Sequence, residues 1–262
     1  MNKVVLITGA SSGIGLCTAE YLSDKGYKVY GVARRQINNE KFTSFMADVN
    51  NHEQIKNVFE KVQEKEGKID VVINNAGMGI SGAIEFTDKQ SVNNIFNTNV
   101  VALIDICSLA IPYLRQSKGK IINIGSVAGP IAIPFQACYS ATKSAVETFS
   151  SALGGEVKDF NIKVVCIRPG DTKTGFTQAR HKIDQNNDQV YKNRVEKSVK
   201  KMEKDEQNGM STVAVSKLIH KAIKKRNPAP VMTVGLGYKF LCLLAKLLPL
   251  RMVNYIVKKI YG

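Results

Sequence analysis

The chain has 262 residues, of which 44% are hydrophobic and 23% are charged, a balance typical of a soluble globular protein with a sizeable core. Its five cysteines are scattered without a C-x-x-C pair or a nearby histidine, so neither a disulfide framework nor a metal site is expected. The net charge is +15, and no acidic residue follows Glu206, which concentrates the positive excess near the C-terminus. Such an excess is found in proteins that contact nucleic acid, an anionic membrane surface or an acidic ligand.

The first residues and the motif content set expectations for location and partners. Met1–Lys3 lead directly into an apolar run that begins at Val4, which leaves no room for a signal peptide, so we expect a cytoplasmic protein. The basic excess is not accompanied by a nucleic-acid-binding motif or an aromatic platform. Nucleic acid is therefore not an expected partner.

Short apolar runs alternate with longer amphipathic segments along most of the chain. The runs are rich in Val and Ile, which is typical of parallel strands buried on both faces. The alternation predicts an α/β fold over residues 1–237, a single Rossmann-like doubly wound domain with a parallel sheet of about seven strands flanked by helices. The expected strands are Val4–Ile7, Lys28–Val32, Phe42–Ala47, Val71–Asn74, Ile121–Ile124, Lys163–Ile167 and Pro230–Val234, and the expected helices are Gly13–Lys25, Glu53–Glu66, Ser91–Gln116, Ala137–Asp159 and Val213–Lys225.

A polar segment interrupts this alternation after the sixth strand. Thr177–Gly209 has mixed charges, few large apolar residues and no strand pattern, so it is expected to hold a helix or two. Its position favours a lid over a ligand, covering about residues 175–210. A solvated surface excursion is the alternative.

The tail, residues 238–262, carries clusters of leucine and isoleucine with basic flanks. Lys246, Pro249 and Arg251 interrupt the clusters, so two short amphipathic helices are expected and a transmembrane helix is not. These helices could pack on the body of the protein or at a subunit contact. They could also lie on an anionic membrane surface or roof an apolar substrate.

Tyr139 and Lys143 are spaced to lie on one face of a helix. A cation about 4 Å from a phenol, at an effective dielectric of about 20, is worth roughly 4 kcal/mol. This corresponds to about three pKa units, enough to bring a tyrosine into the range of an acid–base catalyst. A solvated helical pair explains the same spacing equally well, so the surrounding motifs must decide.

A glycine-rich segment follows the first expected strand and opens the first helix. Glycines at such a turn let the chain bend tightly and let a pyrophosphate approach the positive helix N-terminus. The spacing is G-x-x-x-G-x-G, and its place at a strand-to-helix turn predicts a dinucleotide site. The residues expected to bind are Gly9, Ser11, Ser12, Gly13, Ile14 and Gly15.

Further motifs complete a resemblance to a known family. Ser126 lies thirteen positions before Tyr139, and short motifs follow the third, fourth and sixth expected strands. From residue 3 to about residue 175, the chain resembles the classical short-chain dehydrogenase/reductase family. The resemblance implies a catalytic tetrad and further cofactor contacts. The tetrad would be Asn99, Ser126, Tyr139 and Lys143, and the contacts would be Asp48, Val49, Asn75, Ala76, Gly77, Tyr139, Lys143, Pro169, Gly170, Thr172 and Thr174, where Thr172 replaces a residue that is often aliphatic in the family.

The resemblance also implies a mechanism. Ser126 would hold the substrate's carbonyl or hydroxyl oxygen, and Tyr139 would give or take the proton while hydride passes between the nicotinamide and the substrate carbon. Lys143 would lower the pKa of the tyrosine and bind the nicotinamide ribose. Asn99 would hold the lysine and a water chain that leads to solvent.

Two arginines indicate which dinucleotide is bound. NAD sites usually place a carboxylate near the end of the second strand to hold the ribose 2′-hydroxyl. Here the strand runs into Arg34 and Arg35, and no acidic residue occurs before Glu40. Guanidinium groups bind phosphate through paired N–H donors, so NADP(H) is expected. Ordinary surface arginines are the alternative.

The substrate is less sharply indicated. The apolar segment at residues 129–135, between Ser126 and Tyr139, and the leucine-rich tail favour a sizeable apolar substrate, although a packed loop explains the segment equally well. The tail resembles those of hydroxysteroid and retinol dehydrogenases and of acyl-dihydroxyacetone-phosphate reductases, which implies a steroid-, retinoid- or lipid-like carbonyl. A small ketone or a sugar-derived carbonyl, or a dinucleotide-binding regulator without catalysis, are the alternatives. The family resemblance also implies a homodimer or homotetramer.

Overall fold

The computed structural model describes residues 3–184, 188 and 190–262, so residues 185–187 and 189 of the expected lid lie outside the described residues. Seven parallel strands form one sheet in the order β3-β2-β1-β4-β6-β7-β9, which confirms the predicted doubly wound α/β fold. Each expected strand is present, with ends that differ by one residue at most. The strands are β1 (Val4–Thr8), β2 (Lys28–Ala33), β3 (Thr43–Met46), β4 (Val71–Asn74), β6 (Lys120–Ile124), β7 (Lys163–Arg168) and β9 (Val231–Thr233).

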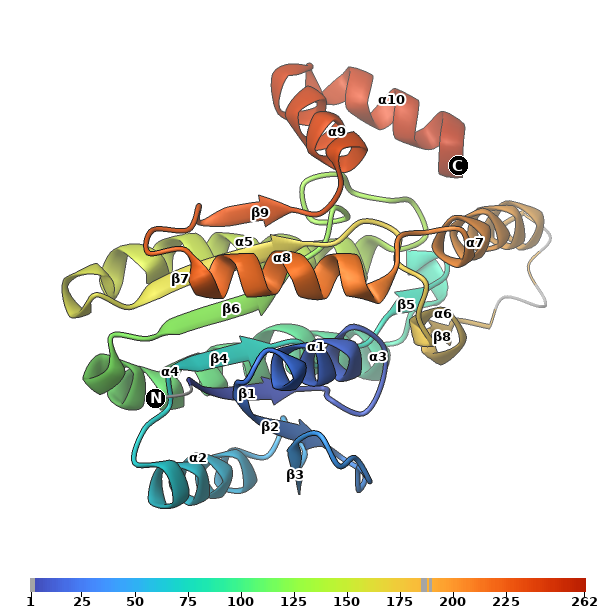
Figure 1. Ribbon diagram of the computed structural model, residues 1–262. Helices are drawn as coiled ribbons and strands as arrows, with labels where there is room; N and C mark the ends of the chain where they lie inside the picture. Colours follow the sequence, from blue (N-terminus) through green and yellow to red (C-terminus); the bar gives the residue numbers. More distant parts are fainter. Residues whose placement is uncertain (1–2, 185–187, 189) are drawn as a thin grey trace.

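Helices cover both faces of the sheet (Figure 1). Alternate residues of β1 point to opposite layers: Val4 and Leu6 pack in one core with α2, α4 and α5, whereas Val5 and Ile7 pack in the other with α1 and α8. This two-sided burial is the reason that the strands are apolar throughout. The covering helices are α1 (Gly13–Asp24), α2 (His52–Glu66), α3 (Lys89–Phe96), α4 (Ala102–Ser117), α5 (Ala137–Glu156) and α8 (Thr212–Lys224), with short 3-10 turns at Ile84–Phe86 (η1) and Lys158–Phe160 (η3).

The helix expected at Ser91–Gln116 is longer and less regular than its apolar pattern indicates. It runs over Lys89–Ser117, and a π-helical stretch, η2 (Asn97–Val101), separates α3 from α4. Among the described residues, Lys89–Ser117 is the one helical stretch whose length and apolar composition would allow it to cross a membrane. Its residues Ile106, Ala110 and Leu114 are buried in the core beside the sheet.

The lid segment contains two helices, α6 (Phe176–Ala179) and α7 (Lys192–Gln207). The expectation that it lacks a strand is wrong: β8 (His181–Lys182) pairs in parallel with β5 (Ile80–Ser81). The pairing depends on backbone bonds, from His181 N to the Gly79 carbonyl at 3.0 Å and from Ile183 N to the Ser81 carbonyl at 2.8 Å. A two-residue strand is too short to leave an alternating pattern in the sequence.

The tail forms the two helices predicted for it, α9 (Leu236–Leu247) and α10 (Leu250–Tyr261), joined at Pro249. Figure 1 shows them beyond the carboxyl end of β9, outside the two layers that cover the sheet. Cys242, Val253 and Val257 are their buried apolar residues, and several of their large apolar side chains are exposed. The tail therefore adds little to the two cores and covers the edge of the sheet where the strands end.

The turn between β1 and α1 brings the helix unusually close to the strand. Gly9 has a φ of 67°, in the left-handed region that glycine adopts without strain. A Cβ at Gly15 would lie 2.1 Å from the Gly9 carbonyl oxygen and 2.5 Å from Nδ2 of Asn75. Asn75 in turn donates from Nδ2 to the Thr8 carbonyl at 3.0 Å, so the ends of β1, α1 and β4 are locked together.

We expect Gly15→Ala to disrupt this packing. The added methyl overlaps a backbone oxygen that cannot move freely, so the variant should lose about 2 kcal/mol of unfolding free energy, roughly 4–8 °C in Tm. Gly155→Ala is the matched control, because that glycine lies in α5 with open space around its Cβ position. The control should gain about 0.5–1 kcal/mol from helix propensity. Equal Tm values for Gly15→Ala and the wild type in calorimetry would contradict the close packing.

Candidate active site

A cavity of about 1070 Å³ lies where the strands end and the tail begins. The carboxyl ends of parallel strands share one edge of a sheet, so motifs that follow different strands meet there. Of the residues predicted to form a site, Gly15 and Asn99 lie behind the cavity wall and the others line it. The lining set is Gly9, Ser11, Ser12, Gly13, Ile14, Arg34, Arg35, Asp48, Val49, Asn75, Ala76, Gly77, Ser126, Tyr139, Lys143, Pro169, Gly170, Thr172 and Thr174.

One end of the cavity is formed by the β1–α1 turn and by the residues that follow β2 and β3. Arg34 and Arg35 are exposed there, and Arg35 Nη2 donates to the Ser11 carbonyl at 3.3 Å. Asp48 accepts from the Asn50 backbone N–H at 2.9 Å, which holds this corner in place. The structure thus brings two guanidinium groups next to a glycine turn at a helix N-terminus.

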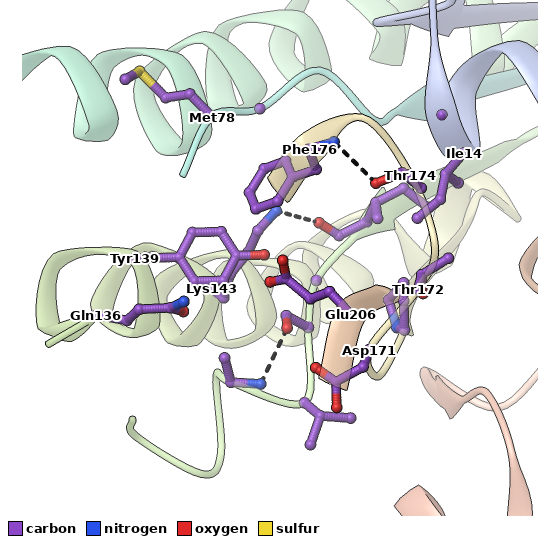
Figure 2. Close-up of a pocket in the computed structure, with 18 of the residues that line it drawn as sticks. Ile14, Met78, Gln136, Tyr139, Lys143, Asp171, Thr172, Thr174, Phe176 and Glu206 are labelled. Carbon is purple, nitrogen blue, oxygen red and sulfur yellow. Dashed lines mark hydrogen bonds between the residues drawn. The ribbon is translucent and has the colours of Figure 1, made fainter. Parts of the chain in front are cut away.

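The other motif residues border the middle of the cavity. Thr174 Oγ1 accepts from the Phe176 backbone N–H at 3.1 Å, and a Cβ at Gly13 would lie 3.4 Å from Thr174 (Figure 2). Thr172 is buried, and its hydroxyl donates to the Gly170 carbonyl at 2.8 Å. The hydroxyl at this unusual position is therefore satisfied within its own turn.

Tyr139 projects from α5 into the cavity (Figure 2). Ser126, which follows β6, is within hydrogen-bonding reach of its hydroxyl. The Phe176 ring lies beside the Tyr139 ring, with 5.7 Å between ring centres. Burial raises the pKa of Tyr139 to about 12 and outweighs the hydrogen bond with Ser126, which acts in the opposite direction. The phenol is therefore protonated at neutral pH.

Lys143 lies one turn further along α5 and is buried, whereas Tyr139 is partly buried. Its Nζ donates to the Ile124 carbonyl at 2.9 Å and lies 5.7 Å from the centre of the Tyr139 ring. Burial lowers the pKa of Lys143 to about 8. Burial has the largest effect on the pKa of both groups, and the expected lowering of the tyrosine pKa by Lys143 stays a prediction.

Asn99 occupies the π-helical stretch η2 and is buried. Its side-chain amide makes two hydrogen bonds with the backbone of Met78: Oδ1 accepts from the Met78 N–H at 2.8 Å, and Nδ2 donates to the Met78 carbonyl at 2.9 Å. Nδ2 also donates to Thr142 Oγ1 at 3.1 Å. Lys143 Nζ donates to the Ile124 carbonyl, and the expected hold of Asn99 on the lysine stays a prediction. The asparagine fixes the wall segment that contains Gly77 and Met78.

The structure adds a polar wall that the sequence interpretation missed. Glu206, near the end of α7, and Asp171, after Gly170, both line the cavity. Glu206 Oε2 accepts from Thr177 Oγ1 at 2.6 Å and Oε1 pairs with Arg180, while Asp171 Oδ2 accepts from the Tyr238 hydroxyl at 2.6 Å. Two features of the sequence could have pointed to these residues. Asp171 directly follows the Pro169-Gly170 cofactor motif, and Glu206 is the last acidic residue of the chain.

The tail completes the cavity on the side away from the glycine turn. Its lining residues are mostly aliphatic and come from both α9 and α10. They are Tyr238, Leu241, Leu244, Ala245, Leu248, Val253, Ile256, Val257, Ile260 and Tyr261. The sequence left several places open for the tail, and in the structure the tail covers the cavity as a roof.

Comparison with known proteins identifies the family. The family described as short chain dehydrogenase matches residues 3–185, and the chain belongs to it, as its motifs predicted. It is 40% identical over 266 residues to the 3-ketodihydrosphingosine reductase of Bacteroides thetaiotaomicron, covering 99% of this chain and 98% of the relative. The protein is thus an oxidoreductase enzyme of the short-chain dehydrogenase/reductase type.

Two further matches extend this result. The NADPH-dependent 1-acyldihydroxyacetone phosphate reductase of Saccharomyces cerevisiae is 32% identical over 191 residues, covering 68% of this chain and 64% of the relative. The crystal structure of a short-chain dehydrogenase from Streptomyces avermitilis superposes with a TM-score of 0.84 at 27% identity, covering 98% of this chain and 95% of that one. The tail is therefore included in the similarity to the Bacteroides and Streptomyces proteins.

The buried ammonium of Lys143 predicts a particular pH dependence of stability. Between pH 8 and 10.5, Lys143 keeps its proton in the unfolded chain but has lost it in the folded chain. The free energy of unfolding therefore rises with pH across this window. Lys143→Met removes this dependence and should gain up to about 3 kcal/mol relative to the wild type at pH 7. The gain should shrink as pH rises from 8 to 10.5, measured by urea unfolding. Lys158→Met, at an exposed lysine, is the control, and a gain independent of pH would refute the assignment.

Proposed function

We propose that this enzyme is an NADP(H)-dependent reductase of a long-chain lipid ketone. The supporting observation is the continuity of one cavity, which runs from Arg34 and Arg35 past Tyr139 to the aliphatic roof of the tail. A polar end suits a phosphorylated dinucleotide, the middle holds a protonated phenol, and the far end suits an alkyl chain. The names of the Bacteroides and yeast relatives, both reductases of lipid ketones, agree with this order.

The residues at the polar end fit the dinucleotide. Ser12 and Gly13 line the cavity at the start of α1, where a helix N-terminus would stabilise a pyrophosphate. Arg34 and Arg35 would hold a 2′-phosphate, since no carboxylate follows β2 before Glu40. The adenine would lie near Asp48 and Val49, and the nicotinamide end near Asn75–Gly77, Pro169–Gly170, Thr172 and Thr174. The yeast relative is named as NADPH-dependent.

In this proposal the chain's own residues bind the carbonyl and supply its proton. Ser126 and Tyr139 hydrogen-bond the carbonyl oxygen, and the bound nicotinamide supplies the hydride. Tyr139 is protonated at neutral pH, so it donates its proton to the oxygen as the carbonyl carbon is reduced to an alcohol. Lys143, 5.7 Å from the ring, is positioned to stabilise the phenolate left behind, and Asn99 keeps the adjoining wall rigid.

Removing the proton donor tests this function. Tyr139→Phe should lower kcat for NADPH oxidation with a long-chain 3-ketone by at least about 100-fold. Tyr113→Phe, in α4 outside the cavity, is the control and should retain wild-type turnover. The same assay with NADH should give a kcat/KM at least about tenfold lower than NADPH, the loss of one charge-assisted phosphate contact. Normal turnover of Tyr139→Phe would overturn the catalytic assignment, and a preference for NADH would overturn the cofactor assignment.

We also propose that residues 1–237 form the catalytic domain and that the tail at residues 238–262 rests on an anionic membrane. In this tail Leu247 and Leu250 are 70% and 72% exposed. The tail also carries basic residues and no acidic one; they are Lys239, Lys246, Arg251, Lys258 and Lys259. An amphipathic helix with exposed apolar side chains and basic flanks binds at a lipid interface. A lipid substrate would then reach the roof of the cavity from the bilayer.

The homodimer or homotetramer expected from the family stays a prediction, which light scattering would measure.

Liposome binding tests the tail. The full chain should co-sediment with vesicles rich in phosphatidylserine, less so as salt is raised, and weakly with neutral vesicles. Leu247→Ser with Leu250→Ser should reduce this binding by at least about tenfold, since each exposed leucine contributes about 1 kcal/mol or more when buried in lipid. Val213→Ser, at an exposed site on α8, is the control. Undiminished binding of the double variant would remove the tail from this role.

A further inference from the structure

Carboxylates gather at the end of the cavity where a carbonyl would meet Tyr139. Glu206 and Asp171 both line the cavity, and both act electrostatically on the Tyr139 hydroxyl. Figure 2 shows the Glu206 carboxylate beside the phenol, with Asp171 on the same side. Among the described residues that line the cavity, the basic ones all belong to the proposed cofactor contacts. Apart from Lys143 beside the phenol, the lining of the substrate end therefore presents negative charge, and the cofactor end presents positive charge.

The neighbouring charges leave this wall with a negative excess. Glu206 pairs with Arg180, and Asp171 lies within electrostatic reach of Lys201 and Asp205. Three carboxylates thus accompany two cations. The Arg180 side chain is 1% exposed and does not line the cavity, and its Nε and Nη1 atoms are buried. A ligand in the cavity contacts the carboxylate of Glu206, while the guanidinium behind it acts on the Tyr139 hydroxyl in the opposite direction without lining the cavity.

Glu206 also has acceptor capacity left for a ligand. Thr177 Oγ1 donates to Oε2 at 2.6 Å, and Arg180 binds Oε1. An ionised carboxylate offers about four lone-pair positions, so these two partners orient the group without saturating it. The bonds to α6 and to the residue that follows it fix the carboxylate beside the phenol, which is the arrangement expected of a recognition group.

We infer that Glu206, supported by Asp171, is a specificity residue that binds a cationic amine on the carbon next to the substrate carbonyl. The inference rests on the proposed function, because it takes the carbonyl oxygen to lie at Tyr139. An ammonium group would form a charge-assisted hydrogen bond with Glu206, whereas a phosphate at the same position would face like charge. The substrate class is then a long-chain amino ketone. This chemistry is that of a sphingoid ketone and differs from that of an acyldihydroxyacetone phosphate.

Paired substrates test the inference with the full chain and NADPH. One substrate is a long-chain ketone with an amine on the carbon next to the carbonyl. The other is a ketone of equal chain length that lacks this amine. The wild type should favour the amino ketone in kcat/KM by at least about tenfold, and Glu206→Gln should lower this ratio at least about tenfold, the size of one charge-assisted bond. Glu203→Gln is the control, because Glu203 lies one turn away on α7, pairs with Lys182 and does not line the cavity. Its ratio should match the wild type.

A measurement on the wild type keeps the test independent of how the variant folds. Alkylammonium and alkyl phosphate of equal chain length should compete with the ketone, and the inhibition constant of the ammonium should be at least about tenfold lower. Equal turnover of both ketones, or equal inhibition by both head groups, would overturn the role of Glu206 and leave the reductase proposal standing. Failure of the wild type to oxidise NADPH with either ketone would instead overturn the proposed function.

Discussion

A chain of buried hydrogen bonds joins the middle of the sheet to the helix that carries the reactive residues. Asn74 Nδ2 donates to Asn123 Oδ1 at 2.9 Å, and Asn123 Nδ2 donates to Ser150 Oγ at 2.8 Å. These bonds link β4, β6 and α5, and α5 supplies both Tyr139 and Lys143. A buried amide that loses its partner costs about 1–3 kcal/mol, so the three elements have one favourable mutual orientation. The position of the phenol relative to the strand ends depends on that orientation.

Burial then decides the protonation of the site. Burial pushes Tyr139 and Lys143 each toward its neutral form, with pKa values of about 12 and 8. A protonated phenol beside a lysine that is close to losing its charge suits proton donation to a carbonyl better than proton removal from an alcohol. This protonation state follows from desolvation and not from the spacing of the pair.

The two ends of the cavity are built in different ways. The cofactor end consists of short turns that follow consecutive strands, so its residues meet wherever a parallel sheet forms. The substrate end is assembled from α6, α7, the residues after β7 and the tail helices. It combines carboxylates from the body with aliphatic side chains from the tail. The chemistry of the substrate end is thus set by segments outside the family motifs. Members of one fold family can therefore differ in substrate at this end of the cavity.

The sequence by itself determined the strands, the helix pattern, the glycine turn and most of the residues that line the cofactor end of the cavity. It could do so because apolar periodicity and turn chemistry are local properties, and because parallel strands carry their following turns to one edge. The β5–β8 pair and the π-helical stretch around Asn99 leave no such local signal. The tertiary structure alone decided that the tail roofs the cavity, that Glu206 lies beside Tyr139 and that burial has the largest effect on the pKa of Tyr139 and of Lys143. Each of these depends on distances between segments far apart in the chain and on the exclusion of water, which only the packed fold specifies.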